Sequence, residues 1–141
     1  MPFDLARFVT AQDDDAVYPR ALDELRAGRK RTHWMWFVFP QIAGLGRSGT
    51  ARHFAVSGLD EAVAYLGHPV LGPRLRECAS ALTSLPGDDA VAVLGPIDAM
   101  KLRSSMTLFA EAAPDETVFR EVLEKYFDAE PDQKTLDLLR G

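Results

Sequence analysis

Residues 71–85, LGPRLRECASALTSL, carry the clearest structural signal in the chain. Their apolar side chains recur at steps of four, three, four and three residues, which places them on one face of an α-helix. These residues are Leu71, Leu75, Cys78, Leu82 and Leu85. Because Pro86 and Gly87 then end the pattern, the stretch predicts a helix that packs one apolar face against a protein core.

Shorter segments with the same periodicity follow one another along the rest of the chain, separated by proline, glycine and polar clusters. The predicted helices cover residues 18–28, 57–66, 69–85, 88–94, 96–113, 119–126 and 135–139. No linker, low-complexity tract or internal repeat interrupts them. We therefore predict a single all-α domain over residues 1–141, a compact bundle-like orthogonal array of about six to seven helices.

One segment departs from the helical pattern. Residues 33–40, HWMWFVFP, are aromatic and lack helical periodicity, and Pro40 favours an extended conformation at the residue before it. We therefore predict an extended aromatic segment from Trp34 to Phe39. Its two tryptophans would lie on opposite faces, so that one fills the core and the other is free to contact a ligand.

The composition is that of an ordinary folded domain. Of 141 residues, 47% are hydrophobic and 26% are charged, which is enough apolar material for a core. The formal net charge of -5 gives no general attraction to a phosphate backbone and argues against nucleic acid as a partner. The basic cluster Arg29 to Arg31 is the one feature in favour of nucleic acid.

Signals for secretion, membrane insertion and metal binding are weak. Cys78 is the single cysteine, no basic or apolar leader follows Met1, and no apolar run approaches the roughly 20 residues of a membrane span. We therefore expect a cytoplasmic protein without a membrane partner. The three histidines are scattered, so neither a metal site nor a cofactor is expected. The sequence indicates no particular oligomeric state.

Three blocks resemble the signature blocks of a bacterial family, the domain of unknown function 1810. They are THWMWFVFPQIAGLGRS at residues 32–48, EAVAYLGHPVLGPRLRE at 61–77 and IDAMKLRSSMTLF at 97–109. The resemblance extends from about Phe8 to Leu139. Two places depart from the family pattern: Phe54, where a tyrosine is usual, and residues 128–130, where a glycine-containing turn is usual. Family members are often labelled calpastatin, a disordered inhibitor, whereas the periodicity here predicts a folded core.

The order of elements also resembles the NADAR family, whose members are associated with ADP-ribose and with cleavage of N-glycosidic bonds. The similar elements are a helix over residues 62–77, then Leu94-Gly95, then a helix over residues 101–106. The glutamate and histidine motif of that family has no clean counterpart here, so its catalytic residues are not carried over. The resemblance implies a nucleotide-derived, phosphate-containing ligand such as ADP-ribose.

The aromatic segment is flanked by groups suited to a flat anionic ligand. Cations precede it, and a loop rich in glycine and hydroxyl groups follows it, so that charged side chains and backbone N–H groups are available to a phosphate. The predicted ligand-binding residues are Lys30, Arg31, Trp34, Trp36, Gln41, Gly44, Gly46, Ser48 and Ser105. Core packing of the tryptophans and a flexible turn at the glycines explain the same residues without a ligand.

Three further residues are candidates for catalysis. Asp98 and Lys101 share one stripe of a predicted helix with Ser105, at i, i+3 and i+7. We predict that Asp98 stabilises positive charge or activates water, with Lys101 beside it. His33 is the third candidate, as a general acid or base. The structural alternatives are a surface ion pair for Asp98 and Lys101 and a hydrogen-bonded histidine for His33.

Two classes of function fit these observations. The first is an enzyme without a metal that binds an ADP-ribose-like molecule and hydrolyses an N-glycosidic bond. The second is a non-catalytic ligand-sensing or protein-interaction module that uses the same cleft. Replacing Asp98 with asparagine separates the classes, because the substitution abolishes turnover in an enzyme and has none to abolish in a binding module.

Overall fold

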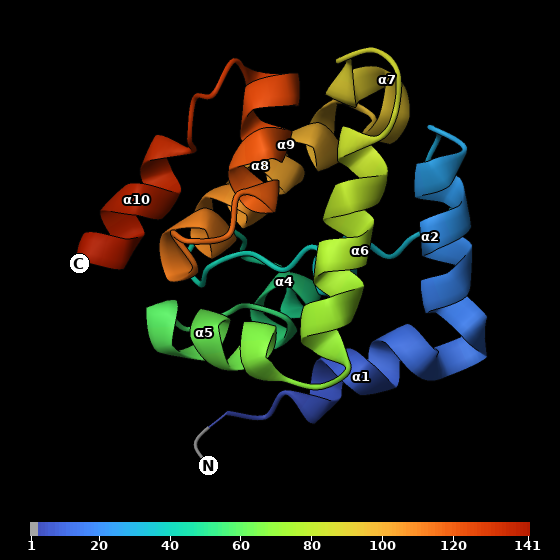
Figure 1. Ribbon diagram of the computed structural model, residues 1–141. Helices are drawn as coiled ribbons and strands as arrows, with labels where there is room; N and C mark the ends of the chain where they lie inside the picture. Colours follow the sequence, from blue (N-terminus) through green and yellow to red (C-terminus); the bar gives the residue numbers. More distant parts are fainter. Residues whose placement is uncertain (1–2) are drawn as a thin grey trace.

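The computed structural model describes residues 3–141, and helices build nearly all of this range (Figure 1). Within it there are nine α-helices of five or more residues, one four-residue helical turn, one 3-10 helix and no β-strand. The elements are α1 Ala6–Asp13, η1 Asp14–Ala16, α2 Val17–Arg26, α3 Met35–Val38, α4 Gly49–His53, α5 Leu59–Gly67, α6 Leu71–Thr83, α7 Ala90–Leu94, α8 Pro96–Ala112, α9 Val118–Phe127 and α10 Gln133–Arg140. The all-α prediction is confirmed.

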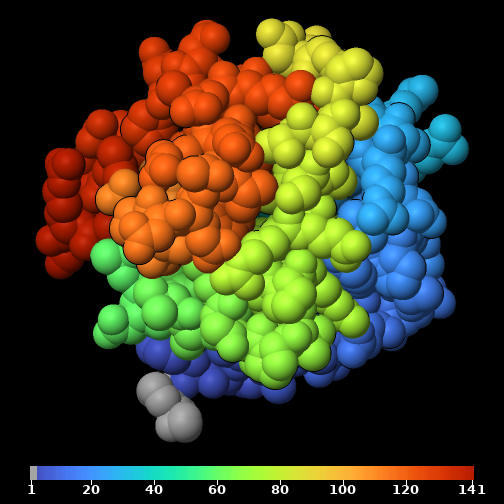
Figure 2. All heavy atoms as spheres, in the orientation of Figure 1, coloured from blue at the N-terminus to red at the C-terminus, as the bar shows by residue number. Residues whose placement is uncertain are grey.

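Helix α6 stands in the middle of the array, as its apolar stripe predicts. Each of the buried stripe residues Leu71, Leu75, Cys78 and Leu82 is at most 1% exposed. The helix contacts α2, α5 and α9, and Figure 2 shows its side chains filling the space between α2 and α9 on one face. In Figure 1, α5 lies beside the lower end of α6 and runs across its direction, as in an orthogonal array of helices.

The buried side chains form one continuous cluster to which helices far apart in the sequence contribute. Phe8 of α1 packs edge-on against Tyr65 of α5 at 5.1 Å between ring centroids, and Tyr65 packs against Phe109 of α8 at 5.3 Å. These aromatic contacts connect α1, α5 and α8 in the core. Across residues 3–141, no helix has the length and apolar character needed to cross a membrane.

The predicted extended segment from Trp34 to Phe39 is wrong. Residues Met35–Val38 form one helical turn, in which the N–H groups of Val38 and Phe39 donate to the carbonyl oxygens of Trp34 and Met35 at 3.1 Å. No strand lies beside this segment in the described part of the chain, so its backbone forms hydrogen bonds within itself. The one β-type contact within residues 3–141 is an isolated parallel bridge between Ile42 and Val56.

The predicted number of six to seven helices is too low because three helices lack a readable apolar stripe. Helix α1 buries the polar side chain of Gln12 together with Phe8. Helices α3 and α4 have four and five residues, which is too short for a helical period to be recognised.

The turn after α9 lies where the sequence departs from the pattern of the family that it resembles. Asp128 and Ala129 have φ angles of 54° and 65°, in the left-handed region that favours glycine. The N–H of Ala129 donates to the carbonyl oxygen of Leu123 at 2.9 Å and so ends the helix. The left-handed backbone at this turn therefore explains why glycine is usual there in the family pattern.

Candidate functional site

A buried carboxylate fixes the segment that carries the two tryptophans. Glu24 of α2 is 8% exposed and accepts hydrogen bonds from the backbone N–H groups of Arg31 and Thr32, at 2.8 and 3.0 Å. It also accepts from the Thr32 hydroxyl at 2.7 Å and from the Trp34 indole N–H at 2.9 Å. Burial by itself would raise the pKa of Glu24, but these hydrogen bonds outweigh it and lower the pKa to about 2. We call these residues the Glu24 cluster.

Two ammonium groups share one carboxylate near the start of α8. Lys30 Nζ lies 2.9 Å from one oxygen of Asp98, and Lys101 Nζ lies 3.1 Å from the other. The side chains of Lys30, Lys101 and Asp98 are 10%, 19% and 17% exposed. Burial acts to raise the pKa of Asp98, but the two lysines more than offset it and lower the pKa. The group therefore holds one more positive charge than its carboxylate neutralises.

Both ammonium groups also face indole rings. Lys101 Nζ lies 4.0 Å from the ring centroid of Trp36, and Lys30 Nζ lies 5.2 Å from that of Trp34. Trp34 is 1% exposed, whereas Trp36 is half-buried. Two positions along a helical turn differ by about 200° around its axis. One indole therefore enters the core and the other stays accessible, although the segment is not extended.

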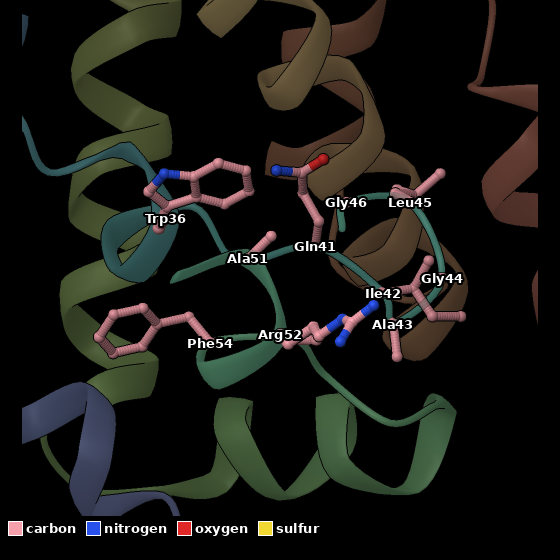
Figure 3. A pocket seen from close by; sticks show the side chains of 11 residues that line it. Trp36, Gln41, Ile42, Ala43, Gly44, Leu45, Gly46, Ala51, Arg52 and Phe54 are labelled. Atoms are coloured by element: carbon pink, nitrogen blue, oxygen red, sulfur yellow. The ribbon is translucent and has the colours of Figure 1, made fainter. Parts of the chain in front are cut away.

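Trp36 forms one wall of a pocket of about 220 Å³ (Figure 3). The loop between α3 and α4 contributes Gln41, and α4 and the residue after it contribute Arg52 and Phe54. Figure 3 shows the amide of Gln41 directed toward the Trp36 ring. We call this pocket, together with Lys30, Asp98 and Lys101, the Trp36 site.

Two glycines allow the loop to pass close to this pocket. A Cβ atom on Gly46 would lie 2.5 Å from the Cβ of Ala51 and 3.6 Å from the Trp36 ring. Gly44 has a φ of +104° and a Cβ there would lie 3.1 Å from Leu138 of α10. Close packing at Gly46 and backbone conformation at Gly44 are thus sufficient reasons for glycine at these positions.

Two buried side-chain polar atoms have no hydrogen-bond partner within residues 3–141, and both belong to residues predicted to bind a ligand. They are Nε2 of Gln41 and Oγ of Ser105. Ser105 is 0% exposed and lies on α8 one turn after Lys101. Leaving such an atom unpaired costs about 1–3 kcal/mol, so native proteins keep few of them.

Three other predicted residues have different surroundings. His33 is exposed, and within the described residues no hydrogen bond joins it to Asp98 or Lys101. The Arg31 side chain is exposed, and its backbone N–H belongs to the Glu24 cluster. The Ser48 hydroxyl caps α4 by accepting from the N–H of Ala51 at 3.0 Å.

The structure adds three residues that the sequence did not suggest: Glu24, Arg52 and Phe54. A signal for Phe54 was present, because the tyrosine usual in the family would carry a hydroxyl on a side chain that lines this pocket. Glu24 gives no such signal, since its partners lie in a loop that is placed only by folding. No group of three or more His, Cys, Asp or Glu side chains in residues 3–141 is arranged to hold a metal ion.

Comparisons with known proteins identify the family. A family model described as "Protein of unknown function (DUF1810)" matches residues 2–139. The chain is also similar to the crystal structure of the conserved hypothetical protein Rv1873 from Mycobacterium tuberculosis, with 50% sequence identity, a TM-score of 0.95 and coverage of 100% of this chain and 99% of that chain. A search of curated proteins gives no significant match. The resemblance to NADAR proteins stays a prediction, whereas the chain plainly belongs to the DUF1810 family.

Proposed function

We propose that the chain binds a phosphate-containing, nucleotide-derived small molecule of the ADP-ribose kind at the Trp36 site. The main support for this proposal is a charge imbalance: two ammonium groups, those of Lys30 and Lys101, contact the single carboxylate of Asp98. The two lysine side chains are only 10% and 19% exposed. A largely buried excess of positive charge is costly unless an anion accompanies it. A phosphate group would balance this charge.

The ring of Trp36 connects the charged groups to the pocket. Lys101 lies over the ring, and the ring also lines the cavity. A ligand that carries an anionic group beside a flat ring system is therefore able to contact both. The volume of about 220 Å³ is below the roughly 300–1,000 Å³ of pockets for drug-sized ligands. The pocket consequently suits one ring system, with the rest of the ligand outside it.

Thermal unfolding tests this proposal with ADP-ribose, NAD, AMP and ribose 5-phosphate as ligands. A ligand present at about 100 times its dissociation constant adds roughly 2.7 kcal/mol of stability, which raises the midpoint by about 5–10 °C for a domain of this size. The Lys101→Met variant should show a smaller shift, whereas Lys134→Met, at an exposed lysine of α10, should behave like the wild type. No shift with any of the four ligands would contradict the proposal.

Hydrolysis of an N-glycosidic bond is a second candidate function, which one observation favours. The lowered pKa keeps Asp98 ionised, and an ionised carboxylate stabilises the positive charge that develops on a sugar ring. Since both oxygens of Asp98 contact lysines, the phosphate of the ligand would have to draw one lysine away. Non-catalytic ligand sensing needs no such step.

Chromatography of products from NAD and from ADP-ribosylated protein tests the catalytic candidate. Loss of turnover in Asp98→Asn, with ADP-ribose affinity retained, would support hydrolysis. Absence of turnover in the wild type, with ADP-ribose bound, would leave the binding function alone.

A further inference from the structure

We infer that the pocket at Trp36 is a subsite for a planar heterocycle whose edge carries a hydrogen-bond donor next to an acceptor, and that the amide of Gln41 reads this edge. The inference rests on the proposed function and deepens it. It places the ring of the ligand in the pocket and its phosphate at Lys30 and Lys101.

The side-chain amide of Gln41 is unlike the other side-chain amides of the chain. The sequence contains three glutamines and no asparagine. Nε2 of Gln12 donates to the carbonyl oxygen of Phe37 at 2.7 Å, and Nε2 of Gln133 donates to Asp137 at 3.0 Å. Among residues 3–141, Nε2 of Gln41 has no hydrogen-bond partner, and the surrounding atoms cover it almost completely. A molecule in the pocket that Gln41 lines would satisfy this donor after a rotation of the amide toward the pocket.

The walls of the pocket combine an aromatic ring with a carboxamide. The ring of Trp36 and the amide of Gln41 line the pocket (Figure 3). The ring of Phe54, a further lining residue, packs against Phe37 at 5.3 Å between ring centroids. Stacking of a base on an aromatic side chain contributes about 1–3 kcal/mol. A carboxamide presents one donor beside one acceptor, which matches the amino group and ring nitrogen on the edge of adenine. Adenine is accordingly the probe of choice.

The test separates the ring from the phosphate with three ligands. Adenosine carries the ring alone, ribose 5-phosphate carries the phosphate alone, and AMP carries both. Titration calorimetry with the wild type, Gln41→Leu and the control Gln133→Leu gives the dissociation constants. We expect Gln41→Leu to raise the dissociation constants of adenosine and AMP about tenfold, the effect of one lost hydrogen bond. The dissociation constant of ribose 5-phosphate should stay unchanged. Gln133→Leu should leave all three unchanged.

A second comparison excludes a general change in the shape of the pocket. Purine riboside lacks the 6-amino group of adenosine. The wild type should bind purine riboside about tenfold more weakly than adenosine, whereas Gln41→Leu should bind the two equally. This comparison within the wild type also holds if the variant does not fold.

The outcomes distinguish this inference from the proposed function. Equal affinity of the wild type and Gln41→Leu for adenosine and AMP would overturn the inference alone, as would binding of ribose 5-phosphate without any binding of adenosine. Binding of adenosine that is lost in Gln41→Leu, without binding of ribose 5-phosphate, would support the ring subsite and overturn the phosphate site. No binding of any of the three ligands would overturn both.

Discussion

The Glu24 cluster and the Trp36 site both include residues of the segment 30–41 but differ in how completely their polar groups are paired. The carboxylate of Glu24 accepts four hydrogen bonds, three from N–H groups and one from a hydroxyl group. At the Trp36 site two ammonium groups share the carboxylate of Asp98, and the amide nitrogen of Gln41 has no hydrogen-bond partner in the described part of the chain. The first cluster is fully paired and is expected to stabilise the fold, whereas our proposal assigns the unmatched charge and the unpaired donor of the second to a ligand.

The two buried glutamine amides show the same contrast. Gln12 is 1% exposed, and its amide binds the carbonyl oxygen of Phe37, the hydroxyl of Tyr65 and the guanidinium of Arg74. It thereby joins α1 to α3, α5 and α6. Within residues 3–141, no hydrogen bond of the Gln41 amide nitrogen joins it to another element. Pairing thus distinguishes a glutamine that connects helices from one that we propose as a ligand contact.

The largest expected effect is the loss of the Glu24 carboxylate. Glu24→Ala should lower the free energy of unfolding by about 3–5 kcal/mol, because it leaves several buried donors unpaired, including the indole N–H of Trp34. Urea denaturation measures this change, with Glu121→Ala, at an exposed glutamate of α9, as the control. A loss below about 1 kcal/mol would show that the Glu24 cluster does not stabilise the fold.

The same carboxylate should make stability depend on pH. The folded protein holds a proton on Glu24 only below a pKa of about 2, whereas the unfolded chain binds it near the ordinary value of 4.5. The contribution is therefore complete above about pH 5 and falls by about 3 kcal/mol as the pH drops toward 2. Urea denaturation between pH 6 and pH 3 should show a steeper loss for the wild type than for Glu24→Gln. Equal losses would contradict the depressed pKa.

An intermediate effect is expected at the charged groups of the Trp36 site. Asp98→Asn leaves two ammonium groups without a counter-charge, so it should lower the free energy of unfolding by about 1–3 kcal/mol. Lys101→Met leaves the balanced pair of Lys30 and Asp98, so it should change stability by less than about 0.5 kcal/mol. Urea denaturation at low salt compares the two variants. A larger loss for Lys101→Met than for Asp98→Asn would refute the charge imbalance.

The smallest effect is expected at Gln41. Gln12→Leu should lower the free energy of unfolding by about 1–3 kcal/mol, because it unpairs the Phe37 carbonyl and the Arg74 guanidinium. Gln41→Leu removes an amide nitrogen that has no partner, so stability should be unchanged or should rise by up to about 1 kcal/mol. Equal losses in the two variants would mean that the amides are equally satisfied.

Local patterns in the sequence predicted the parts of the fold that depend on neighbouring residues. The leucine stripe predicted α6, the predicted helices over residues 88–94 and 96–113 correspond to α7 and α8, and the i, i+3 spacing placed Asp98 beside Lys101. The same reasoning missed α1, in which Gln12 takes a buried position that an apolar residue would usually hold. It also gave an extended conformation to Met35–Val38, because aromatic composition does not show whether a neighbouring strand exists.

The remaining features of the site depend on contacts between distant parts of the chain. The ion pair of Lys30 with Asp98 forms because the loop after α2 packs beside α7, where the N–H of Lys30 donates to the carbonyl oxygen of Val93 at 2.7 Å. The pocket that Gln41 lines forms because α3, the loop after it and α4 fold back on one another. No spacing rule along the chain predicts either contact, whereas the residue types themselves, a lysine and a glutamine beside tryptophans, were recognisable in the sequence.

The most direct test is a ¹H–¹⁵N correlation spectrum of the whole chain during titration with AMP. The chain has three glutamines, no asparagine and two tryptophans, so few side-chain amide and indole N–H signals are expected. Those of Gln41 and Trp36 report on the Trp36 site, and those of Gln12 and Trp34 report on fully paired groups of the fold. We predict that the signals of Gln41 and Trp36 shift while those of Gln12 and Trp34 stay in place. Unchanged signals for Gln41 and Trp36 at millimolar AMP, or equal shifts at Gln12 and Trp34, would contradict it.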